Sequence, residues 1–292
     1  MRLAFVHGIK NEDNDADTIR EEWWAALEEG WQSLGLAPKP RPPIDVGYYG
    51  RLLAEGLPDE VAEMGPGGTA TATGFSAGLL REYAEAAGLT QAELDAAAAE
   101  LGIEPEVVAQ GIPFQGAIVK FASVLERALP TKGKYISRVL LNQAIRYIND
   151  DALAAAVDRD VRRQIFDDKT DPVVVIAHSL GTVVSYRLLA DGNQAQRNVP
   201  LFVTLGSPLS VRMFRSVLPP RGTMPRPPIG TWLNGRNSED FVTLGRAIDR
   251  DRIGFDGVID HPDVRSDDLN VHNIRDYLRD PVVARTIYDA LV

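Results

Sequence analysis

Short apolar runs alternate along the chain with stretches of helical spacing. Residues 3–6, 173–176 and 201–205 are almost entirely apolar, which is typical of parallel strands covered on both faces. Between such runs, apolar residues recur every three or four positions over 135–147 and 153–166, which predicts amphipathic helices. The alternation predicts an α/β fold with a mostly parallel central sheet flanked by helices.

One predicted strand runs directly into a helix at a serine. After the strand 173–176, helical spacing begins at Leu180, and Ser179 lies at the turn between the two. Ala177 and Gly181, two residues to either side, are small enough for backbones to pass closely. This arrangement predicts a nucleophile elbow, in which a serine hydroxyl is held clear for attack and the Leu180 N–H can stabilise an oxyanion.

The elbow resembles that of the α/β-hydrolase family, usually written G-x-S-x-G, with Ala177 here in place of the first glycine. The first predicted strand ends in His7-Gly8-Ile9, which is also similar to that family. The resemblance implies that His7 belongs to the oxyanion loop, that Gly8 lets the chain bend, and that Ile9 N–H is the second oxyanion donor. In the alternative interpretation, the stretch is a helix start whose serine has no catalytic role.

The sequence contains four histidines, which are the candidates for the general base. If Ser179 is the nucleophile, the family's chain order implies an acid and then a histidine further along the chain. His178 adjoins the serine and points the wrong way around the turn, so His261 and His272 remain. By resemblance the base lies between the last strand and the last helix, which favours His272, with His261 as the alternative.

The acid is assigned by resemblance. Trp232-x-Asn234 followed six residues later by Asp240 is similar to a family pattern in which this aspartate is the triad acid. Three other acidic residues remain as alternatives, namely Glu239, Asp249 and Asp260.

A second serine, Ser207, also follows a predicted strand and competes for the role of nucleophile. The residue after it, Pro208, has no backbone N–H to offer an oxyanion. Ser179 is therefore preferred.

About 120 residues separate the predicted strand 44–49 from Val173, far more than one crossover helix needs. They predict an inserted helical cap over 52–131, with alanine-rich helices near 75–87 and 91–101, and an α/β-hydrolase core formed by 1–51 and 132–292. The apolar stretch Phe114–Leu129 either lines an acyl pocket or packs on the sheet.

The amino-acid composition argues against several classes of function. With 41 acidic and 31 basic residues the net charge is −10, which argues against nucleic-acid binding. The absence of cysteine excludes a catalytic thiol, a thiolate metal site and disulfides, and suits a reducing compartment. With no leader-like start and no apolar run of membrane-spanning length, a cytoplasmic location without integral membrane association is expected.

The acidic run at 11–17 lacks the glycine and glutamate of a calcium loop. It instead predicts a solvated loop before a helix over about 19–34, with Asp17 or Thr18 as N-cap and Glu21 completing a capping box. No metal or organic cofactor is expected.

The resemblance implies a serine hydrolase that cleaves an ester bond of a small or lipid-like acyl substrate through an acyl-enzyme. Ser179, His272 and Asp240 would form the triad, Ile9 and Leu180 the oxyanion hole, and His7, Gly8, His178 and Gly181 would support them. An amidase or peptidase on the same triad, and a catalytically silent binding protein, are the alternatives. The sequence leaves the oligomeric state open.

Overall fold

A six-stranded parallel sheet organises the part of the chain that the computed structural model describes, namely residues 1–8, 14–54, 78–79, 81–100, 102, 124, 137–191, 197–217, 229–248, 257–266 and 270–291. The strands follow the order β2-β1-β3-β4-β5-β6, and every neighbouring pair is parallel. They are β1 (Arg2–Val6), β2 (Ile44–Gly47), β3 (Val173–His178), β4 (Val199–Leu205), β5 (Ile229–Gly235) and β6 (Val258–His261). The sequence-based expectation of an α/β fold is confirmed.

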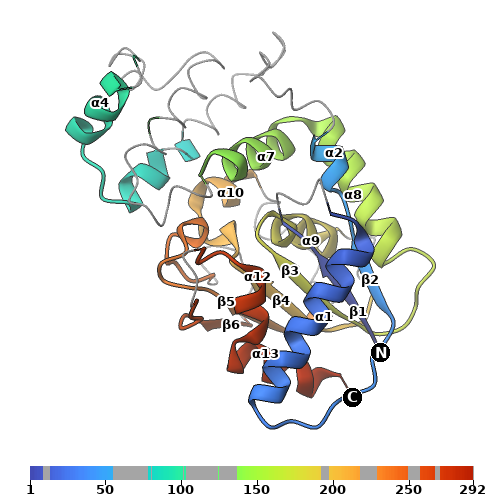
Figure 1. Ribbon diagram of the computed structural model, residues 1–292. Helices are drawn as coiled ribbons and strands as arrows, with labels where there is room; N and C mark the ends of the chain where they lie inside the picture. Colours follow the sequence, from blue (N-terminus) through green and yellow to red (C-terminus); the bar gives the residue numbers. More distant parts are fainter. Residues whose placement is uncertain are drawn as a thin grey trace.

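Helices cover both faces of this sheet, whereas α4 lies away from it (Figure 1). The helices and turns of the described residues have the following bounds. They are α1 (Ala16–Ser33), α2 (Gly50–Ala54), α4 (Gln91–Glu100), α7 (Ser137–Asn149), α8 (Asp151–Ile165), α9 (Leu180–Ala190), α10 (Arg212–Val217), α12 (Ile274–Arg279) and α13 (Pro281–Ala290), with short 3₁₀ turns η2 (Pro208–Ser210) and η3 (Phe241–Thr243).

Strand alternation divides the core into two layers. In β3, Val174 and Ile176 pack with α1, α12 and α13, whereas Val173, Val175 and Ala177 face the layer of α7, α8 and α9. All six β3 residues are buried, as expected for a central strand between two helical layers. Each such buried aliphatic side chain contributes about 2 kcal/mol to the free energy of unfolding.

The strand order reverses direction between β1 and β3, because β2 lies on one side of β1 and all later strands lie on the other. In open α/β sheets, ligands bind at the carboxyl ends of the strands beside such a switch point. His7 follows β1 and Ser179 follows β3, so the fold brings both predicted site segments to this position.

The start of α1 differs from the sequence-based expectation. The N-cap is Asp15, whose carboxylate accepts a hydrogen bond from Thr18 N at 2.7 Å. Glu21 pairs with Arg41 instead of closing a capping box. Asp15, Asp17 and Thr18 are all good capping residues, so composition alone does not select among them.

The predicted cap at 52–131 falls largely outside the described residues, and so does the stretch Phe114–Leu129 apart from Val124. Within that range, α4 matches the helix predicted near 91–101, and residues 81–86 are helical. The division into a core and a cap stays a prediction.

Candidate active site

Ser179 occupies a strained turn between β3 and α9. Its backbone angles are φ 53° and ψ −129°, a region that non-glycine residues enter at a cost of about 1–3 kcal/mol. Two backbone hydrogen bonds hold it there: Ser179 N–H donates to Leu205 O at 3.0 Å, and Thr182 N–H donates to Ser179 O at 3.0 Å. This strand–turn–helix geometry is that of a nucleophile elbow.

The end of β1 passes directly across this turn. A Cβ atom on Gly181 would lie 2.3 Å from His7 O and 2.4 Å from Val6 O, and a Cβ on Gly8 would lie 2.6 Å from Ser179 Cβ. Both contacts are closer than real Cβ atoms approach. Glycine at positions 8 and 181 therefore lets the two segments meet.

His272 and Asp240 form a buried pair. His272 lies in the loop between β6 and α12, and its Nδ1 is 2.7 Å from Asp240 Oδ2. Asp240 follows β5, is 1 % exposed, and caps η3 by accepting a hydrogen bond from Val242 N at 3.0 Å. The pair has the geometry in which a carboxylate orients an imidazole and stabilises its protonated form.

Besides His178 Nε2 and His261 Nε2, two further buried atoms at this end of the sheet have no hydrogen-bond partner in the described part of the chain, namely Ser179 Oγ and His272 Nε2. Both are buried, and native proteins rarely tolerate such groups without a functional reason. The His272 ring lies 4.4 Å from the ring of His178, the residue before the serine.

Gly206 leaves room for the His272–Asp240 pair. It has φ +54°, and a Cβ there would lie 2.8 Å from His272 Cε1 and 3.0 Å from Asp240 Oδ2. Only glycine suits both the positive φ and this close approach.

Three residues named above as alternatives for the base and the acid either contact other groups or lie outside the described residues. His261 Nε2 is 2.9 Å from Asp280 Oδ1. Asp260 accepts hydrogen bonds from the side chains of Asn234 and Arg236 at 2.8 and 2.9 Å. Asp249 lies outside the described residues.

The Ser207 hydroxyl is hydrogen-bonded to neighbouring residues. Its Oγ is 2.7 Å from Thr182 Oγ1 and accepts a hydrogen bond from Leu209 N at 3.2 Å. This hydroxyl caps η2, whereas the Ser179 hydroxyl has no such engagement.

Of the two predicted oxyanion donors, the structure describes only Leu180. Leu180 is the first residue of α9, where backbone N–H groups have no partner within the helix. Ile9 lies outside the described residues.

His7 is fully buried and neutral. Tyr49 N–H donates to its Nε2 at 3.0 Å, so Nδ1 carries the proton and donates to Gly8 O. Burial lowers the pKa of His7 to about 4, against an ordinary value of 6.5. The ring also stacks on Tyr49, with centroids 4.3 Å apart, and therefore anchors the end of β1.

Replacing His7 with glutamine is expected to flatten the pH dependence of stability between pH 6.5 and 4. The unfolded chain binds a proton at His7 before the folded protein does, so the wild type loses stability as the pH falls through this window. The lowered pKa corresponds to about 3 kcal/mol over the whole window. Urea unfolding of both proteins across this range measures the difference.

Carboxylates that titrate in the same window are common to both proteins and cancel in this comparison. Parallel stability curves for wild type and His7→Gln would contradict the expectation.

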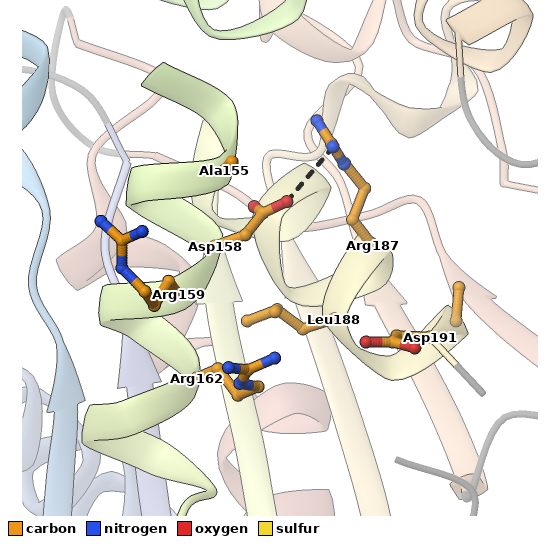
Figure 2. A pocket seen from close by; sticks show the side chains of 8 residues that line it. Ala155, Asp158, Arg159, Arg162, Arg187, Leu188 and Asp191 are labelled. Carbon is orange, nitrogen blue, oxygen red and sulfur yellow. Dashed lines mark ion pairs between the residues drawn. The ribbon is translucent and has the colours of Figure 1, made fainter. Parts of the chain in front are cut away.

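Two hollows among the described residues lie away from Ser179. One, of about 320 Å³, lies between α8 and the far end of α9. Figure 2 shows Arg187 paired there with Asp158, at 3.2 Å, with further charged side chains around them. The other, of about 440 Å³, includes His261 and Asp280. Neither includes the His272–Asp240 pair.

A search of the described residues found no group of three or more histidine, aspartate or glutamate side chains that could hold a metal ion. Among the helices of this part of the chain, none is both long and apolar enough to cross a membrane.

Comparison with known proteins gives one family match. The model of the family described as "PGAP1-like alpha/beta domain" matches residues 122–216, about a third of the chain, which includes β3, Ser179 and α9. Searches of the curated proteins and of the solved structures gave no match. Taken with the parallel sheet and its flanking helices, the match supports an α/β-hydrolase-type fold for the chain.

Proposed function

We propose that the chain is a serine hydrolase that cleaves an ester bond of a small or lipid-like acyl substrate. The observation that carries the proposal is the buried Asp240–His272 pair, whose imidazole packs on the ring of His178, the residue before a strained serine with no side-chain partner among the described residues. The match to an α/β-hydrolase-type domain across Ser179 supports hydrolysis in general.

In the proposed reaction Ser179 Oγ attacks the acyl carbonyl carbon, and its proton passes to His272 Nε2. Asp240 holds the Nδ1–H side of the ring and stabilises the imidazolium. The N–H groups of Leu180 and, by family resemblance, Ile9 bind the oxyanion. His272 then protonates the leaving alcohol, and water hydrolyses the acyl-enzyme through the same base.

Ser179 has no exposed surface and His272 is 7 % exposed, so both side chains are buried in this structure. Part of the predicted cap range contacts the acid's loop: Tyr83 O–H donates to Val242 O at 3.1 Å, and its ring lies 4.9 Å from that of Phe241. Glu82 accepts hydrogen bonds from the N–H groups of Arg212 and Met213. These contacts join residues 82 and 83 to η3 and to the start of α10.

A fluorophosphonate probe tests the proposal, because it reacts with an activated serine by displacement of fluoride. Mass spectrometry of the digested protein is expected to place the adduct on the peptide containing Ser179. An adduct on Ser207, or no adduct in folded protein at any probe concentration, would overturn the proposal; the second result would favour a silent binding protein. A panel of acyl esters with matched amides then distinguishes an esterase from an amidase or peptidase.

A further inference from the structure

We propose that Tyr277 is a positioning residue for this reaction, whose hydroxyl fixes the Asp240 carboxylate and limits the negative charge that it presents to His272. The inference rests on the proposed function. It concerns a residue outside the triad, on α12, five positions after His272.

Tyr277 and His272 converge on one oxygen atom. Tyr277 O–H donates to Asp240 Oδ2 at 2.6 Å, and His272 Nδ1 lies 2.7 Å from the same atom. The other oxygen, Oδ1, accepts the Val242 N–H. The carboxylate is thus held by three donors, one of which competes directly with the imidazole for electron density.

The direction of the tyrosine bond is determined by its surroundings. Tyr277 is fully buried, and burial together with the nearby Asp240 raises its pKa well above the usual value of 10. The hydroxyl therefore stays protonated and donates to the carboxylate, while it accepts the Asn237 N–H at 3.2 Å.

Loss of this hydroxyl would leave more negative charge on the oxygen that faces His272. The protonated imidazole would then be stabilised more strongly, and a more alkaline pH would be needed to produce the neutral base. The expected signature is a shift of the acid limb of the pH–rate profile toward higher pH.

Other groups around the pair are the same in wild type and variant. His178 packs on the His272 ring, and burial lowers the pKa of His178 well below the ordinary value. Burial and Asp240 raise the pKa of Tyr83. Arg236 pairs with Asp260, and Glu82 pairs with Arg246. A shift on changing position 277 alone therefore reports on Tyr277.

The test is the rate of fluorophosphonate modification of Ser179 as a function of pH in wild type and Tyr277→Phe. The midpoint of the acid limb is expected to rise by about half a pH unit, which is the size that one net hydrogen bond supports. At acidic pH this corresponds to a roughly threefold slower reaction.

Tyr147→Phe is the matched control, because Tyr147 is also buried and its hydroxyl also donates to an aspartate, Asp158. That pair lies beside the hollow between α8 and α9, away from Ser179. Tyr147→Phe is expected to leave the midpoint unchanged, although it removes an equivalent bond.

An unchanged midpoint in a folded Tyr277→Phe protein would overturn the inference, whereas an unreactive wild type would overturn the proposed function instead. A ring-fluorinated tyrosine at position 277 serves if Tyr277→Phe does not fold. Its hydroxyl is a stronger donor, so the midpoint is expected to fall, and a rise or no change would contradict the inference.

Discussion

Replacement of Ser179 or His272 by alanine is expected to lower turnover of an ester substrate by roughly 10⁴-fold or more, because nucleophile and base act as one unit. Ser179→Ala should also abolish the fluorophosphonate adduct. His272→Ala should slow adduct formation to a similar extent, because the hydroxyl then has no base to take its proton. Steady-state kinetics and the rate of labelling measure these two effects.

His261→Ala is the matched control for the base. His261 is the other histidine with a ring nitrogen close to a buried aspartate, Asp280, and it ends the edge strand β6. Activity close to wild type is expected for this variant. A loss with His261→Ala and none with His272→Ala would reverse the assignment.

The second large effect is on stability. Gly181→Ala would place a Cβ within 2.4 Å of two backbone carbonyl oxygens at the end of β1, and neither can yield without moving a central strand. The free energy of unfolding is expected to fall by about 3 kcal/mol or more. Urea denaturation followed by circular dichroism measures the change.

Gly35→Ala provides the comparison. Gly35 has a φ of +65° but no atom within 4 Å of its Cβ position, so the cost is limited to the left-handed backbone, about 1 kcal/mol. Equal losses of unfolding free energy in the two variants would contradict the close contact between the end of β1 and Gly181.

The parts of the fold and the site that could be predicted from sequence are those with strong local signals. The switch from β-type to helical spacing at Ser179 predicts the turn between β3 and α9 within a residue of where the structure has it. The loop position of His272 follows from its place between the last strand and the last helices. Such signals depend on neighbours in the chain, which a sequence displays directly.

The role proposed for Tyr277 could not be predicted from the sequence, because it depends on partners that are distant along the chain. Its spacing within α12 is that of an ordinary core residue, and its hydroxyl meets Asp240 and Asn237, which are 37 and 40 residues away in sequence. A buried tyrosine near the candidate base, whose hydroxyl must find a partner, was the available signal. Gly206 could not be recognised from the sequence for the same reason. In the sequence it belongs to a Gly-Ser-Pro turn, whereas in the structure it leaves room for the side chains of His272 and Asp240.

The strand order has a consequence for how the chain folds as it is made. β1 pairs with β2 at Leu3↔Ile44, but its other edge pairs with β3 at Leu3↔Val174, which is synthesised much later. At typical ribosomal rates, the delay between these strands is on the order of ten seconds. Throughout that time one edge of an apolar strand has no partner, and pairing across so long a separation is itself slow. β3, the strand that leads into Ser179, is therefore also the strand whose synthesis allows β1 and β2 to pair with the rest of the sheet.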